Sequence, residues 1–228
     1  IAHGKQETTS IRSFLNSFEI KPYSYGLAKE RKDTALYFNV KSPVFPEPVK
    51  EKLDIPRYNY GASNDEDEPQ EAELLENGAF RSRIITNDTT GEKIFVSFFK
   101  LQRYNYIKDS SLLDKENHAS LFGDSSGIVR MKKKFELPNK IKIWEKLITD
   151  TGSSRTIWSK VFFRDGIGFA LLTQSDTLSK PSSFIQSFFD SFTPADTLKG
   201  SDAFAKKSGL FFADFMSADT MAHKRAVK

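Results

Sequence analysis

Apolar and polar residues alternate along several stretches of the chain, a period of two that is typical of β-strands that bury one face. In residues 34–40, Leu36, Phe38 and Val40 share one side of such a strand. Three prolines within residues 42–48 exclude a central strand there. The pattern predicts an antiparallel sheet of five to seven strands. The further strand-like stretches are residues 78–86, 92–106, 128–137, 140–149, 155–164 and 167–174.

The last two of these strands are joined by Asp165 and Gly166, a dipeptide typical of a two-residue type I′ turn. Such a turn places Phe163 opposite Gly168 and thereby sets the register of the hairpin. The face that carries Gly168 also carries Ala170, so it leaves room for a helix to approach closely.

Residues 182–192 have the period of an amphipathic helix, with Ser182 or Ser183 as the N-cap. Pro194 follows and ends the helix. We expect this helix to pack over the face of the hairpin that carries Gly168. Its apolar stripe consists of Phe184, Ile185, Phe188, Phe189 and Phe192.

The phrase Ser-Phe-x-x-Ser-Phe occurs at residues 13–18 and again at residues 187–192, and a proline follows each copy. If the copies are a repeat, residues 1–26 form the closing helix of a preceding unit, or an N-terminal extension. Phe14 should then lie outside the core of the main sheet. The alternative is that two Phe-rich amphipathic helices converged by composition, because Phe and Ser are both common in this chain.

These elements predict an α+β fold, an antiparallel meander with helices packed on one or both faces, as in an α/β sandwich. Residues 27–196 would form the main domain. Residues 110–122 allow one more short amphipathic helix. Residues 197–228 have the pattern of one or two short helices without a stop signal, so we expect the native chain to continue in a longer parent.

Composition narrows the class of protein. Hydrophobic residues make up 38% and charged residues 28%, which suits a globular fold, and the 21 Phe favour sheet. No apolar run approaches the roughly 18 residues of a membrane span. Cysteine is absent, which excludes disulfides, a thiolate nucleophile and a Cys-based zinc site. The first ten residues have neither a signal-peptide pattern nor an initiator Met, which indicates a processed protein or a piece of a longer one.

The formal net charge of +4 conceals an uneven distribution. Residues 64–76 carry seven acids and no base, so without their charge of −7 the rest of the chain sums to +11. The basic residues are scattered, which argues against nucleic acid as a partner. Their densest run, residues 130–142, alternates with apolar positions. We interpret it as the solvated face of a strand, with a surface for an anionic ligand as the alternative.

Residues 123–127 read Gly-Asp-Ser-Ser-Gly, which places Ser125 where a hydrolase of the G-x-S-x-G type has its nucleophile. A nucleophile elbow needs a strand before the serine and a helix after it, whereas here a strand is predicted to follow. A triad would also need a downstream histidine, and His223 in the tail is the one that the sequence offers. We interpret the stretch as a loop and keep a serine hydrolase as the alternative.

Evidence for bound ligands is weak. Asp65 and Asp67 could bind Ca²⁺, but their spacing does not match a calcium loop, so a flexible acidic loop is favoured. The three His are isolated, and no cofactor or zinc site is predicted. Two stretches combine an Arg with two Tyr, which could stack on a sugar or on single-stranded nucleic acid, although tyrosines are also common at sheet edges. These residues are Arg57, Tyr58, Tyr60, Arg103, Tyr104 and Tyr106.

The order of elements over residues 34–192 resembles the PsbP-like family of α/β sandwiches. The matching stretches are the opening at residues 38–46, the hairpin at residues 155–176 and the closing helix at residues 184–192. That family is related to an extrinsic subunit of photosystem II and to bacterial envelope domains, and its members are mostly non-catalytic binding or assembly modules. The C-terminal tail also resembles accessory regions of larger bacterial envelope proteins.

The resemblance implies a non-catalytic binding or scaffolding domain of a larger bacterial protein in the periplasm or cell envelope. Its partner would be another protein or a neighbouring domain of the same chain. The resemblance assigns no metal or ligand-binding residue in this sequence.

Overall fold

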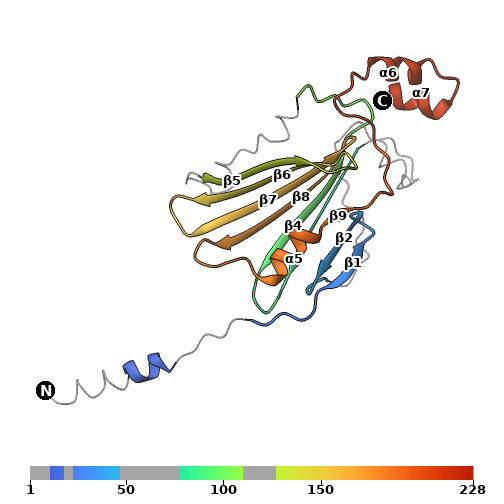
Figure 1. Ribbon diagram of the computed structural model, residues 1–228. Helices are drawn as coiled ribbons and strands as arrows, with labels where there is room; N and C mark the ends of the chain where they lie inside the picture. The colour runs from blue at the N-terminus through green and yellow to red at the C-terminus, as the bar shows by residue number, and fades with distance from the viewer. Residues whose placement is uncertain (1–10, 18–22, 47–77, 110–126, 228) are drawn as a thin grey trace, which may run out of the picture.

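The computed structural model describes residues 11–17, 23–46, 78–109 and 127–227, in which two antiparallel sheets dominate (Figure 1). Of the described strands, six form the larger sheet: β3 (Ala79–Thr86), β4 (Lys93–Lys100), β5 (Gly127–Glu136), β6 (Lys142–Asp150), β7 (Arg155–Arg164) and β8 (Ile167–Asp176). The smaller sheet consists of β1 (Lys29–Asp33), β2 (Phe38–Ser42) and β9 (Thr193–Pro194). The labelled helices are α5 (Ser183–Ser191), α6 (Ser208–Phe215) and α7 (Thr220–Val227), and residues 11–16 are also helical.

The strands of the larger sheet lie in the order β3-β4-β8-β7-β6-β5, and each neighbouring pair is antiparallel. The predicted α+β class with an antiparallel sheet is confirmed. Strands β5 to β8 form a meander, whereas the β3–β4 hairpin joins it through β8. The predicted strand over residues 92–106 is wrong beyond Lys100, because Lys100 lies opposite Ile167, where β8 begins. Beyond that point the sheet offers β4 no further partner.

The hairpin of β7 and β8 has the predicted turn and register. Asp165 and Gly166 both have positive φ, 50° and 73°, as a type I′ turn requires. Phe163 lies opposite Gly168, and the pairing continues to Arg155 at the far end of the hairpin. The local turn chemistry is therefore sufficient to define this pair of strands.

The face of the sheet that α5 covers is opposite to the predicted one, so that prediction is wrong. Trp158 of β7 stacks on Phe189 of α5 with ring centroids 4.3 Å apart, and Phe169 of β8 belongs to the same core cluster. The space beside Gly168 is filled instead by the ring of Phe99 from β4. The aromatic face offers α5 more apolar area to bury than the face with small residues does.

Both ends of α5 follow from single residues. Ser182 is the N-cap, since its Oγ accepts a hydrogen bond from Ile185 N at 3.3 Å. After Phe192 the chain is extended, and Pro194 pairs with Phe38 of β2. The helix therefore lies beside β2 and over β7 of the larger sheet. Among the described residues, no helix is both long and apolar enough to cross a membrane.

The two copies of the repeated phrase have different surroundings. Phe188 of α5 is fully buried, whereas Phe14, in the equivalent position of the first copy, is 63% exposed. Phe18 lies outside the described residues. An exposed Phe14 is what a repeat predicts, and an unrelated N-terminal extension predicts it equally.

Candidate interaction surfaces

A carboxylate anchors the C-terminal helices to the body of the protein. Asp214 of α6 accepts hydrogen bonds from Arg103 Nε at 2.7 Å and from the Tyr104 hydroxyl at 2.8 Å. Its side chain is only 12% exposed. The hydrogen bond from Arg103 is the largest influence that lowers the pKa of Asp214. Burial, followed by the bond to Asp214, raises the pKa of Tyr104. At neutral pH the carboxylate is therefore ionised and the phenol protonated.

Helix α6 turns this carboxylate toward the protein, and the apolar residues on its opposite side face solvent. At about 100° per residue, Phe212 and Met216 lie on the side of the helix opposite to Asp214. Phe212 is 62% exposed and Met216 is 78% exposed, and Phe215 is exposed as well. A helix on a globular protein normally has the reverse polarity, with its apolar stripe inward. We refer to Phe212, Phe215 and Met216 as the α6 patch.

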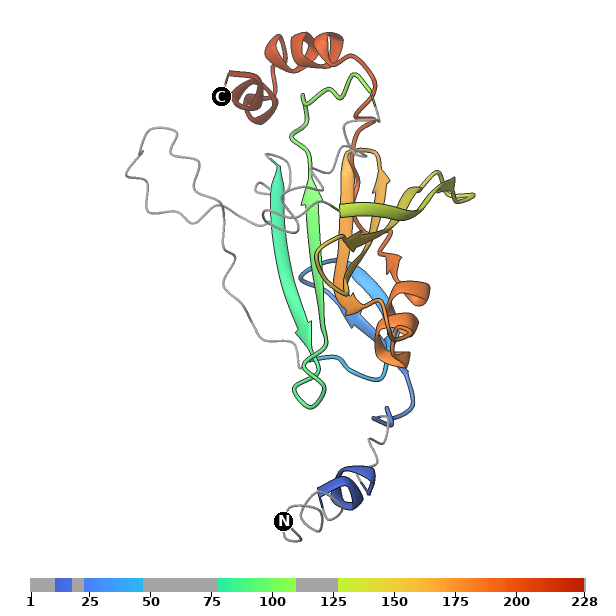
Figure 2. The same cartoon turned by 90° about the vertical axis from the view of Figure 1, so that its left-hand side faces the viewer.

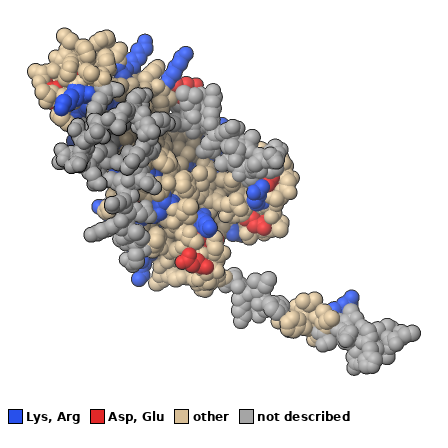
Figure 3. All heavy atoms as spheres, turned by 180° about the vertical axis from the view of Figure 1, so that it is seen from behind, with Lys and Arg blue, Asp and Glu red and all other residues tan. Residues whose placement is uncertain are grey.

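The α6 patch belongs to a well-anchored part of the fold. Helices α6 and α7 stand beyond the end of the sheet where β7 turns into β8 (Figures 1 and 2). The ring of Phe211 lies 5.6 Å from that of Tyr104, and the ring of His223 on α7 lies 5.4 Å from that of Phe215. In Figure 3 this end of the molecule, at upper left, is mostly uncharged, with Lys and Arg at its border.

Strand β5 is a second exposed element, and it contains most of the basic run found in the sequence. The strand predicted over residues 128–137 is confirmed as β5. Most of its residues are exposed, on both faces of the sheet, including Phe135 at 42%. A solvated strand face and a surface for an anionic ligand both predict this exposure, so both interpretations remain open. Its basic residues are Arg130, Lys132, Lys133 and Lys134.

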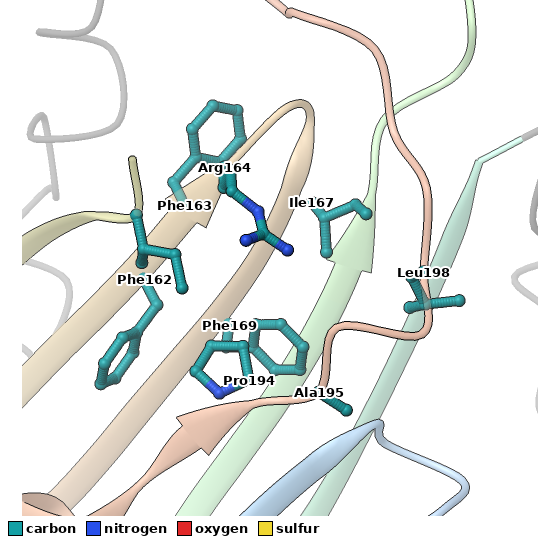
Figure 4. A pocket seen from close by; sticks show the side chains of 9 residues that line it. Phe162, Phe163, Arg164, Ile167, Phe169, Pro194, Ala195 and Leu198 are labelled. Atoms are coloured by element: carbon teal, nitrogen blue, oxygen red, sulfur yellow. The ribbon is translucent and has the colours of Figure 1, made fainter. Parts of the chain in front are cut away.

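A small cavity lies between the β7–β8 hairpin and the segment that follows β9 (Figure 4). Its volume is about 20 Å³, which is room for about one water molecule. Phe169 and Ile167 line one side of it, and Pro194 and Ala195 line the other. Arg164 at its margin is paired with a carboxylate of the segment after β9. A cavity of this size cannot hold an organic substrate, since ligand pockets are usually about 300–1,000 Å³.

A half-buried lysine that the sequence did not single out lies under α5. Lys160 of β7 donates a hydrogen bond to Phe189 O at 2.8 Å, near the C-terminal end of the helix, where a cation is favourable. Burial is the main cause that lowers the pKa of Lys160, and the nearby carboxylate of Glu145 opposes it. Glu145 in turn accepts a hydrogen bond from Trp158 Nε1 at 2.9 Å. These contacts fix α5 on the sheet, which is a structural role.

The candidate residues for catalysis and for metal binding fall largely outside the described part of the chain. Ser125, Asp65 and Asp67 are among them. Strand β5 begins at Gly127, the last residue of the Gly-Asp-Ser-Ser-Gly stretch, so a strand follows Ser125 as the sequence predicted. His223 is occupied by α6, with its Nδ1 2.6 Å from Phe215 O. Among the described residues, no group of three or more His, Asp or Glu could hold a metal ion.

The predicted Arg and Tyr surface is only partly described. Arg57, Tyr58 and Tyr60 lie outside the described residues. Of the second set, Arg103 and Tyr104 are engaged by Asp214, whereas Tyr106 is exposed. Sequence reasoning selected two residues of the anchor for α6 without recognising their partner.

The chain matches no protein-family model and no curated protein. The candidate function therefore depends on the surfaces described above.

Proposed function

We propose that the protein is a non-catalytic binding or scaffolding domain of a larger bacterial protein, and that another protein or a neighbouring domain covers the α6 patch. The observation that carries this proposal is the reversed polarity of α6. Asp214 is buried against Arg103 and Tyr104, while Phe212 and Met216 face solvent. Contiguous exposed apolar residues on a globular protein mark interaction sites.

The free energy involved is large enough to matter for binding. Fully burying a Phe or Met side chain gains about 1.5–3 kcal/mol. The ion pair between Arg103 and Asp214 fixes the side of α6 that faces outward, so a partner would meet an ordered surface and binding would cost little conformational entropy. Aromatic residues and Met are also enriched at protein interfaces.

We further propose that the fold is a PsbP-like α/β sandwich and that the domain works in the bacterial periplasm or cell envelope. The support is a six-stranded antiparallel sheet with α5 and the smaller sheet contributing to the same core cluster. The family's binding and assembly roles agree with an exposed apolar surface.

A serine hydrolase that uses Ser125 is the alternative. The strand that begins at Gly127 occupies the position where a nucleophile elbow requires a helix. The alternative predicts that a fluorophosphonate probe labels the protein and that Ser125→Ala abolishes the labelling. An unlabelled wild type would exclude it.

The binding proposal is tested by placing a photo-crosslinking amino acid at position 212 of the full-length protein in its host. We expect a cross-link to one defined polypeptide or to a neighbouring domain. The matched control is the same amino acid at Phe80, an exposed residue of β3, which should give no such product. If position 212 reacts with solvent only, or with the same products as position 80, the α6 patch is not an interface.

A further inference from the structure

Strand β5 is one outer strand of the larger sheet, and of the described strands only β6 pairs with it. The register with β6 shifts between Val129 and Met131, and pairing is then unbroken over residues 131–136. An outer strand presents a row of backbone N–H and C=O groups that a further strand can pair with. The regular part of β5 is long enough to take an average strand, which is about 5–6 residues.

The side chains of β5 define the kind of strand that could pair with it. Four of the five residues at positions 130–134 are Arg or Lys. Lys133 lies on the same face of the sheet as Phe135, whereas Lys134 lies on the other face, with its Nζ 5.7 Å from the Trp144 ring centroid. One face of an added strand would therefore meet Lys132 and Lys134, and the other face would meet Met131 and Phe135 on either side of Lys133.

The other outer strand of the larger sheet, β3, does not offer the same basic edge, because its two arginines bind groups of the segment that includes β1 and β2. Arg83 pairs with Asp33 at 2.6 Å, and Arg81 donates a hydrogen bond to Ala35 O at 2.7 Å. Both contacts tie β3 to the turn between β1 and β2. On β5, by contrast, Arg130 and the three lysines at positions 132–134 are exposed at the outer edge of the sheet.

We infer that the outer edge of β5 binds an extended segment of a partner protein in which acidic residues alternate with apolar ones, by adding that segment to the sheet as a seventh strand. Lysines on an outer strand repel another basic strand and thereby prevent self-association. For an acidic strand the same lysines become favourable cross-strand partners. Backbone pairing supplies affinity in this mode of recognition, and the side chains supply specificity.

The inference concerns a surface separate from the α6 patch and does not depend on it. A nucleic acid would need the positive charge but not the backbone groups of β5, and the two requirements can be separated by experiment. The probe is a fluorescein-labelled peptide of alternating Glu and Val, added to the full chain at low salt and followed by fluorescence anisotropy.

We expect saturable binding, with affinity reduced about tenfold by the double substitution Lys132→Glu and Lys134→Glu, because these two residues share one face of β5 and two favourable charge pairs with the acidic face of the peptide become repulsive. The matched control is Lys29→Glu with Lys32→Glu on β1, an outer strand of the smaller sheet, which should leave the affinity unchanged. Methylating alternate backbone nitrogens of the peptide keeps its charge but removes hydrogen-bond donors, and it should abolish binding.

Four outcomes would overturn the inference. In the first, the N-methylated peptide binds as tightly as the unmodified Glu and Val peptide. In the second, a peptide of alternating Lys and Val binds as tightly as that peptide. In the third, single-stranded DNA displaces the probe and N-methylation of the peptide has no effect. The fourth is a gain in affinity when the acids of residues 64–76 are replaced by amides, which would make this chain's own segment the occupant. The substitution Met216→Gln should leave peptide binding unchanged, so the inference and the proposed function can fail separately.

Discussion

Gly168 of β8 lies directly beneath the aromatic ring of Phe99 on β4, its cross-strand neighbour. A Cβ built on Gly168 would overlap that ring. Phe99 also stacks on Phe163 of β7, with ring centroids 6.2 Å apart and ring planes inclined by 29°. The glycine therefore allows the ring of Phe99 to cross β8 close to the β7–β8 turn.

The substitution Gly168→Ala should destabilise the protein by about 1–3 kcal/mol, the usual cost of overpacking a close-packed site. Urea unfolding followed by tryptophan fluorescence measures the change. In a Phe99→Val background the ring is gone, so the same substitution should cost much less. Additive costs of the two substitutions would show that Phe99 does not occupy the space above Gly168.

The N-cap of α5 gives a second prediction. Ser182→Ala should lower the free energy of unfolding by about 0.5–2 kcal/mol, because the N–H of Ile185 loses its acceptor. Ser183→Ala changes an exposed neighbour in the first turn and is the control, which should have little effect. Equal losses from the two substitutions would contradict the assignment of the cap.

The strands of the larger sheet and the β7–β8 register could be predicted because both depend on local chemistry. The smaller sheet was predicted less well: β1 was missed, and residues 34–37 of the strand predicted over residues 34–40 form a turn before β2. A period of two defines a strand, and Asp165-Gly166 defines its turn. The face that α5 covers could not be predicted, since both faces of the hairpin carry apolar residues. The choice depends on Phe99, which comes from a strand elsewhere in the chain and fills the space beside Gly168.

The candidate surfaces could also be predicted only in part from the sequence. The basic run of β5 is visible in the sequence, and its exposure follows once β5 is the outermost strand. The orientation of α6 was not predicted, although a single Asp214 within an otherwise apolar helix is a signal that could have been used. Its partner Tyr104 is 110 residues away, and no periodicity relates two such distant positions.

Removing the anchor should release α6 without unfolding the sheet. Asp214→Ala leaves Arg103 and Tyr104 without their shared acceptor, at a local cost of about 1–3 kcal/mol. Hydrogen exchange should become faster over residues 208–215 and remain unchanged in β7 and β8.

Asp196→Ala is the matched control. It also removes an ion pair, with Arg164, but Asp196 is 77% exposed, so a loss of no more than about 1 kcal/mol is expected. Unchanged exchange in α6 of the Asp214→Ala variant would contradict the anchoring role.

The anchor should also depend on pH in two opposite ways. The pKa of Asp214 is lowered from 3.8, chiefly by its bond from Arg103, so its contribution is present above that value. That contribution is lost as the pH falls through the lower pKa of the folded protein. The pKa of Tyr104 is raised from 10.0, chiefly by burial, so the contribution of the phenol is complete below that value and is lost as the pH rises above it. Docking of α6 should therefore be constant between these limits and decline on both sides.

Fluorine NMR of 4-fluorophenylalanine at position 211 would follow this docking, because the Phe211 ring packs against Tyr104. Fluorescence of Trp158, beneath α5, would report any unfolding of the core separately. Tyr104→Phe keeps the ring and should remove the alkaline decline alone, whereas Asp214→Asn should remove the acid decline. A docking signal that changes only together with Trp158 fluorescence would mean that α6 has no independent equilibrium, and the proposed role of Asp214 as a local anchor would be wrong.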